Sequence, residues 1–297
     1  MIAHFPLPFA RPIAAVLQFL LCVAALNISP GNRASCAEPI RALLVLGGCC
    51  HDYPVQQRLI TEGISKRANV QWKIAFDPDQ GTSHLNPVYE NENWADGFDI
   101  IVHDECCSDV KDPAIIERIL APHRRGLPAV LLHCGMHSYR SEGYPRTTPW
   151  FDFTGVASTG HGPQVPIVLR ALLEETPVSG RRNAPHSILK GWSDWTTIRE
   201  ELYNNSAGKL IDTATPLIVG KQTYKDREGK EVNAEAVVAW TNVYADKTRV
   251  FATSLGHNNE TVGDDRYLDL ITRGLLWSLD KLDEEHMQPA ARVLLDP

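Results

Sequence analysis

The first half of the chain alternates short apolar runs with amphipathic stretches, and this alternation constrains the fold more than any other feature. Residues 41–46, 98–103 and 128–132 are mainly apolar, and residues 70–76 alternate apolar with polar side chains. Short apolar runs of this kind indicate strands that are buried on both faces. Residues 54–67 and the segment opened by Asp112 and Pro113 carry apolar residues at helical spacing. The pattern predicts an α/β fold with a parallel sheet covered by helices.

The second half of the chain is less regular. Residues 165–169 and 216–220 resemble strands, and residues 236–241 and 248–254 resemble the two arms of a hairpin. A last helix is expected over residues 264–280, where apolar residues share one face. No segment has the composition of a linker, so we expect a single domain over residues 38–297.

Residues 1–37 have the composition of an export signal. An uncharged apolar run over residues 13–28 follows Arg11, and Ser35 and Ala37 occupy the small-residue positions of a cleavage site. We predict a signal peptide over residues 1–37, cleavage after Ala37, and a periplasmic or extracellular protein without a stable membrane span. A membrane anchor is the alternative, but the apolar run is slightly short for one.

Charge and cysteine content restrict the partners and the chemistry. The 297-residue chain has a formal net charge of −7, which argues against nucleic acid as a partner and leaves a small molecule as the expected one. Homo-oligomerisation stays open. Five cysteines follow the predicted signal, so at least one thiol is free unless chains pair. A cross-strand disulfide such as Cys50–Cys106 and free, half-buried thiols are both compatible with this pattern.

Polar, titratable and sulfur-containing residues follow directly after several of the predicted strands. They form four groups, at residues 47–52, 103–107, 133–137 and 255–260. In an open parallel sheet the carboxyl ends of the strands meet at one edge, where ligands bind. The sequence therefore predicts a histidine-rich cleft at this edge.

The histidines of these groups suggest two alternatives. Imidazole is a common ligand of zinc and similar ions, so His51, His133 and His257 are candidate ligands of a divalent metal such as Zn²⁺. Alternatively, the histidines form hydrogen bonds with loops and with the hydroxyl groups of a ligand.

Several longer segments resemble the ThuA-like (trehalose utilisation) family. They are PAVLLHCGMHSYR at residues 128–140, HGP at 161–163, EELY at 200–203 and VVAWTNVYADKTRVFATSLGHNNE at 237–260. The resemblance spans about residues 41–282. It implies the flavodoxin-like three-layer sandwich of class I glutamine amidotransferases, and a role in the catabolism of trehalose or a related disaccharide or oxidised sugar.

The resemblance also implies positions for individual residues. His133 falls at the nucleophile position of the amidotransferase elbow, and His257 and Glu260 fall near its later His and Glu. A tight elbow needs small residues two positions before and after the nucleophile. For His133 only Gly135 satisfies this and Leu131 does not, whereas for Cys134 neither Leu132 nor Met136 does, so a cysteine glutaminase or peptidase is disfavoured.

These considerations give a set of candidate site residues. We expect acid–base or metal-assisted chemistry on a carbohydrate hydroxyl or carbonyl group, with catalytic candidates His133, His257, Glu201 and Glu105. The candidate substrate-binding residues are Asp52, Cys134, His137, Trp150, His161, Tyr203 and Asn258. A carbohydrate-binding or accessory module of the same fold, without turnover, is the alternative.

Overall fold

The computed structural model describes residue 1 and residues 38–175 and 182–296. The predicted signal peptide, including its cleavage site, lies outside these residues. Within the described part of the chain, no helix is long and apolar enough to span a membrane.

A ten-stranded sheet forms the centre of the fold, in the order β14-β2-β1-β3-β4-β13-β12-β11-β6-β9. Its first six strands are parallel: β14 (Leu294–Leu295), β2 (Val70–Asp77), β1 (Ile40–Gly48), β3 (Ile100–Cys106), β4 (Ala129–Leu132) and β13 (Thr248–Thr253). The remaining strands are antiparallel: β12 (Glu231–Tyr244), β11 (Ala214–Lys225), β6 (Val168–Ala171) and β9 (Trp195–Thr196).

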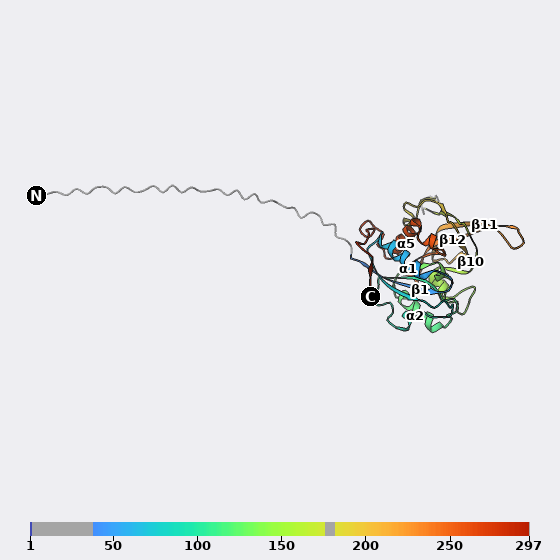
Figure 1. Ribbon diagram of the computed structural model, residues 1–297, viewed down its shortest axis with the longest axis horizontal. Coiled ribbons are helices and arrows are strands. Elements are labelled where there is room, and N and C mark those ends of the chain that lie inside the picture. The colour runs from blue at the N-terminus through green and yellow to red at the C-terminus, as the bar shows by residue number, and fades with distance from the viewer. Residues whose placement is uncertain (2–37, 176–181, 297) are drawn as a thin grey trace. The chain divides into compact units, whose positions relative to one another are not determined.

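Helices cover both faces of this sheet. Figure 1 shows α1 (Tyr53–Ser65) and α5 (Asp265–Ser278) on one side of β1, and α2 (Pro113–Arg124) on the other. Side chains along β1 alternate between two hydrophobic clusters, with Leu44 and Leu46 in the cluster of α1 and α5, and Leu43 and Val45 in the cluster of α2. The predicted three-layer α/β sandwich is therefore confirmed.

Shorter elements complete the fold. They are η1 (Pro87–Glu90), η2 (His133–His137), α3 (Pro149–Thr154), η3 (Ser187–Leu189), α4 (Asn259–Val262) and a small pair β7 (Leu173–Glu175) and β8 (Arg182–Pro185). A separate antiparallel pair, β5 (Val156–Val165) and β10 (Glu200–Leu210), lies outside the main sheet. The sequence does not predict this pair, and the single strand expected over residues 165–169 is wrong: its residues divide between the end of β5 and the start of β6.

The parallel strands that precede the polar groups end at the same edge of the sheet. Gly47 of β1 lies beside Glu105 of β3, and Thr253 of β13 lies beside Leu132 of β4. The next residues of these strands therefore emerge together, opposite β5 and β10.

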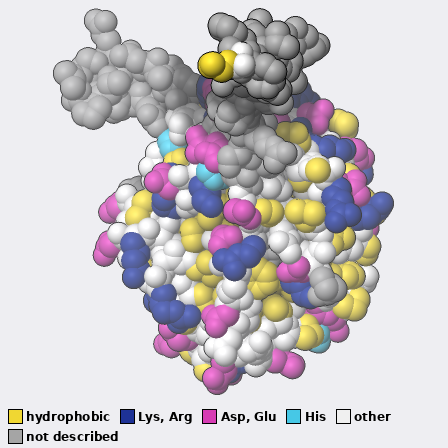
Figure 2. Space-filling model, turned by 90° about the vertical axis from the view of Figure 1, so that its left-hand side faces the viewer, with side chains coloured by type: hydrophobic (Ala, Val, Ile, Leu, Met, Phe, Trp, Pro, Cys, Tyr) yellow, Lys and Arg dark blue, Asp and Glu magenta, His cyan; other side chains and the backbone are white. Residues whose placement is uncertain are grey.

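One face of the surface carries mixed charges. Figure 2 shows Lys and Arg side chains interspersed with Asp and Glu over the described residues of this face.

Candidate functional site

A cleft of about 520 Å³ lies at the shared carboxyl edge of the strands. Its volume is in the range of small-molecule sites, roughly 300–1,000 Å³. Most of the predicted site residues line it. The lining residues are Cys49, Cys50, His51, Thr82, Cys106, Ser108, Cys134, His137, Arg140, Thr159, Gly160, His161, Gln164, Glu201, Tyr203 and His257.

His133 occupies the sharp turn between β4 and η2. Its φ of 34° lies in the left-handed region, which is rare for a residue other than glycine. Nδ1 of His133 donates a hydrogen bond of 2.6 Å to the carbonyl oxygen of Ser254. This bond leaves Nε2 as the acceptor, directed at the cleft residues Tyr203 and Glu201. Gly135 allows the turn to pack, because a Cβ there would lie 3.0 Å from the carbonyl oxygen of His103.

The backbone around His257 is held in place by the buried side chain of Glu200. Glu200 is fully buried, and its carboxylate accepts hydrogen bonds from the backbone N–H groups of Gly256, His257 and Asn258 at 3.2–3.4 Å. Glu200 therefore fixes the loop after β13, and this leaves its neighbour Glu201 free to face the cleft.

The carboxylate of Glu201 lies among three imidazoles. Its Oε2 is 3.3 Å from Nδ1 of His257, 3.5 Å from Nε2 of His133 and 3.6 Å from Nε2 of His161. Burial alone would raise the pKa of Glu201, but the neighbouring imidazoles of His133 and His257 outweigh burial and lower it. Glu201 is therefore ionised at neutral pH.

His51 contacts both other central histidines. Its ring centroid lies 4.9 Å from that of His133 and 4.7 Å from that of His257. Burial, reinforced by repulsion from His133 and His257, lowers the pKa of His51 to about 3. The imidazole is therefore neutral at physiological pH and keeps a lone pair.

Tyr203 connects His133 with the wall of the cleft. Its hydroxyl group donates to Nε2 of His133 at 3.0 Å, and its ring stacks on His137 with a centroid distance of 4.1 Å. Burial raises the pKa of Tyr203 well above its usual value, so the hydroxyl group stays protonated. Tyr203 can thus donate a proton or a hydrogen bond, while Glu201 can accept one.

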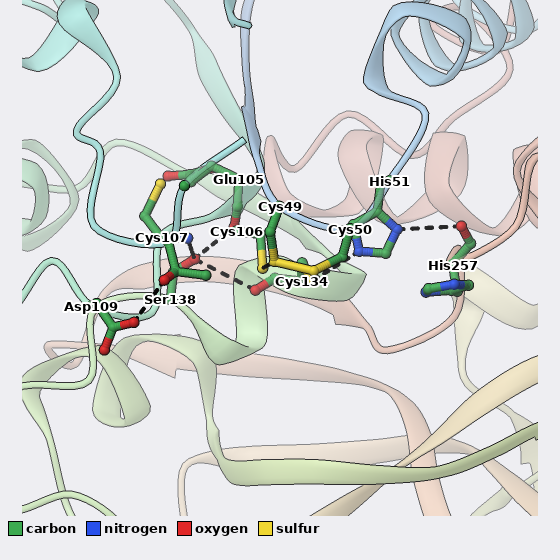
Figure 3. The surroundings of a disulfide bond; sticks show 12 residues. Cys49, Cys50, His51, Glu105, Cys106, Cys107, Asp109, Cys134, Ser138 and His257 are labelled. Carbon is green, nitrogen blue, oxygen red and sulfur yellow. Dashed lines mark hydrogen bonds between the residues drawn. A yellow bond between two sulfur atoms is a disulfide. The ribbon is translucent and has the colours of Figure 1, made fainter. Parts of the chain in front are cut away.

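Sulfur atoms form the floor of the cleft beside His51 (Figure 3). Cys49 and Cys50 form a disulfide between adjacent residues, whereas Cys106, Cys107 and Cys134 are free thiols. The suggested Cys50–Cys106 bridge is thus replaced by a vicinal one. Cys106 lies close by, with its Sγ 3.3 Å from that of Cys49.

His133 is buried and is not part of the cleft lining, and four further predicted site residues do not line the cleft either. Glu105 is fully buried, and its Oε1 accepts hydrogen bonds from the hydroxyl groups of Tyr89 and Tyr139. Because side chains alternate along a strand, Glu105 points into the hydrophobic cluster of α2 and not toward the cleft. This placement corrects its assignment as a group that acts on substrate.

The other three have structural contacts. Trp150, expected nearest the cleft, is fully buried and donates from Nε1 to the carbonyl oxygen of Gly135 at 2.7 Å. Asp52 accepts a hydrogen bond from the side chain of Asn259, and the side chain of Asn258 donates to the carbonyl oxygen of Arg199. These contacts support the loops that carry the cleft residues, and they correct the expectation of direct substrate binding.

Two polar residues of the cleft are missing from the sequence-based set. The amide of Gln164 donates to Oε1 of Glu201 at 3.1 Å and to Nε2 of His257 at 2.7 Å. Arg140 is a cation in the wall, and its buried Nε makes no hydrogen bond within the described structure. Arg140 ends the PAVLLHCGMHSYR segment and Gln164 follows the HGP segment, so the local sequence did contain a signal for both.

Comparisons with known proteins agree with this architecture. The family model for ThuA, described as trehalose utilisation, matches residues 60–278. A ThuA-like protein from Bacteroides uniformis ATCC 8492 is similar in structure, with a TM-score of 0.56 and 13% identity over 84% of this chain and 94% of that one. The glutaminase domain of CTPS from Trypanosoma brucei aligns with a TM-score of 0.42 and 12% identity, over 86% of this chain and all of that domain.

No curated protein sequence matches the chain. The family model nevertheless covers well over half of the 297 residues, and the structural similarity supports the same α/β fold. The chain therefore belongs to the ThuA family, described as trehalose utilisation.

Proposed function

We propose that the protein binds a carbohydrate in this cleft and transfers a proton to or from one of its hydroxyl or carbonyl groups. Membership of a trehalose-utilisation family favours a disaccharide or an oxidised derivative as the substrate class. The single observation that carries the proposal is the ionised carboxylate of Glu201 among the imidazoles of His133, His161 and His257.

The two sides of the proton transfer have separate residues. Glu201 is assigned as the general base, because its carboxylate is ionised at neutral pH and its Oε2 faces His133 and His257 inside the cleft. Tyr203 and His133 form the acid side, since the tyrosine hydroxyl group keeps its proton and is in contact with Nε2 of His133. Gln164 orients Glu201 and His257 together.

Polar groups of the cleft walls suit a sugar. His161 is partly exposed in the wall, and Arg140 offers N–H donors to sugar oxygens. Carbohydrate hydroxyl groups need such convergent donors and acceptors, because each buried hydroxyl group that lacks a partner loses binding energy.

The experiment is a substrate screen with matched variants. The chain that starts at Glu38 is incubated with trehalose, related disaccharides and their oxidised forms, and products are followed by NMR. We expect Glu201→Gln to lower turnover about 100-fold or more, whereas Glu235→Gln, in an exposed ion pair with Lys221, leaves it unchanged. Binding without turnover would support the accessory-module alternative, and the absence of both would contradict the proposal.

We also propose that the protein is exported. The apolar run at residues 13–28 and the Ser35-x-Ala37 pattern support this. N-terminal sequencing of protein from the native host should find Glu38 as the first residue, and an intact Met1 on the mature protein would contradict export.

A further inference from the structure

Three imidazoles from distant segments converge at the base of the cleft. His51 follows β1, His133 follows β4 and His257 follows β13. One ligand atom from each of the three lies within 4.8 Å of those of the other two. Two nitrogen ligands of one zinc ion lie about 3.3 Å apart when each is 2.0–2.1 Å from the metal, so side-chain shifts of ~1 Å bring all three onto one ion.

Backbone hydrogen bonds fix two of the rings in the tautomer that a metal requires. Nδ1 of His133 donates to the carbonyl oxygen of Ser254 at 2.6 Å, and Nδ1 of His51 donates to the carbonyl oxygen of His257 at 3.3 Å. In each ring the lone pair is then on Nε2. Metal-binding histidines commonly donate their second nitrogen to a carbonyl or a carboxylate in this way, which orients the ring and raises its basicity.

A buried nitrogen of the third ring has no hydrogen-bond partner. Nδ1 of His257 is inaccessible to solvent and makes no hydrogen bond, although Oε2 of Glu201 lies 3.3 Å away. Buried polar atoms of this kind are rare and indicate a missing partner such as an ion or a water molecule. Nε2 of the same ring lies 2.7 Å from the side-chain amide of Gln164. A cation on Nδ1 therefore requires the proton to be on Nε2 and the amide of Gln164 to turn its oxygen toward it.

We propose that His51, His133 and His257 bind a divalent transition metal, best matched by Zn²⁺, with the carboxylate of Glu201 beside the ion and not among its ligands. Zn²⁺ takes three imidazoles in open sites, where the fourth position is left to water or substrate. The inference concerns the same cleft as the proposed function but does not depend on a sugar.

The neighbouring thiol and the sulfur cluster affect this assignment. Sγ of Cys134 lies 2.9 Å from Nε2 of His51, so this thiol contact has to give way when the metal binds. Cys49, Cys50 and Cys106 also lie close enough together to bind an ion. However, the Cys49–Cys50 disulfide removes two of those thiolates, so the histidine site is the one available in the oxidised protein.

The test uses tag-free chain from Glu38 onward, treated with chelator and titrated with ZnCl₂ by calorimetry. One equivalent of Zn²⁺ should bind, and CoCl₂ should give the visible absorption of a four-coordinate site. We expect His51→Ala and His257→Ala each to weaken Zn²⁺ binding about 100-fold or more, and Glu201→Gln to weaken it less. His286→Ala is the matched control, because this imidazole does not line the cleft and pairs with Asp283, and the substitution should change the Zn²⁺ affinity less than threefold.

Folding of each variant is checked by circular dichroism. His133 is not substituted, because it is buried and its removal would disturb the core. The absence of Zn²⁺ binding by the folded parent chain, or equal affinity in His51→Ala and His286→Ala, would overturn the metal proposal. Sugar binding is measured separately on the chelator-treated protein. Zn²⁺ binding without any sugar binding would contradict the proposed function alone, and sugar turnover without Zn²⁺ binding would contradict the metal site alone.

Discussion

The hydroxyl group of Tyr203 lies 3.0 Å from Nε2 of His133, although the two residues are 70 positions apart in the chain. Nδ1 of His133 carries the ring proton and donates it to the carbonyl oxygen of Ser254. Nε2 is therefore an acceptor, and the hydroxyl group of Tyr203 is the donor in this pair. Proton movement through His133 is therefore coupled to the tyrosine hydroxyl group.

Tyr203→Phe removes this donor and keeps the ring that stacks on His137. We expect kcat on the best sugar substrate to fall about tenfold or more with little change in KM, because the ring still fills the cleft wall. Steady-state kinetics of the purified variant measure both constants. A rise in KM at constant kcat would instead assign Tyr203 to binding alone.

Glu200 and Glu201 are adjacent but should respond differently to substitution. Glu200→Ala leaves the buried backbone N–H groups of Gly256, His257 and Asn258 without their acceptor, so we expect a loss of about 3 kcal/mol in the free energy of unfolding. Urea denaturation of the purified chain measures it. Glu201→Gln should change stability by less than about 1 kcal/mol, and equal losses in the two variants would refute this division of roles.

Acid should destabilise the protein through His123. Burial, together with repulsion from His103, lowers the pKa of His123 to about 3, whereas the unfolded value is about 6.5. Between these values the unfolded state binds the proton and the folded state does not. Stability is therefore complete above pH 6.5 and falls as the pH decreases toward 3, by at most ~1.4 kcal/mol per pH unit.

Thermal or urea unfolding between pH 7.5 and 4 checks this slope. His123→Phe should be less stable at pH 7.5, because it loses the hydrogen bond to the carbonyl oxygen of Leu127. Its stability should nevertheless decline less steeply with acid than that of the parent chain. An unchanged slope would show that His123 already carries a proton in the folded state.

The three free thiols should differ in reactivity. A hydrogen bond from Cys134 lowers the pKa of Cys106, whereas burial raises the pKa of Cys107 well above its usual value. Because the thiolate is the reactive form, iodoacetamide should label Cys106 first. Peptide mass spectrometry over time follows the order, and denatured protein should show comparable rates for all three. Without reductant, Cys49 and Cys50 should stay unlabelled in both states.

Trp150 should matter for stability and not for the ligand. Trp150→Phe keeps most of the buried ring but loses the hydrogen bond to the carbonyl oxygen of Gly135, which should cost about 1 kcal/mol. Sugar affinity, measured by calorimetry, should stay within twofold of the parent value. A large loss of sugar affinity without a loss of stability would show that Trp150 takes part in ligand binding.

The parallel half of the fold was predictable because its information is local. Apolar runs at residues 41–46 and 128–132 read as buried strands, and parallel strands place the residues that follow them at a common edge. That rule predicts that His51, His133 and His257 lie close together, and the structure confirms it. The antiparallel pair β5 and β10 was not predictable, because its strands are irregular in register and pair across more than 30 residues of intervening chain.

Tertiary structure decided which members of each polar group reach the cleft. Glu105 and Cys106 are neighbours in sequence, but the alternation of a strand places Cys106 in the cleft wall and Glu105 in the core. Glu200 and Glu201 diverge in the same way, one under the loop of His257 and the other among the histidines. The sequence by itself determined the kinds of groups and the edge at which they gather. Their direction depended on pairing and packing over long sequence separations, which local patterns do not encode.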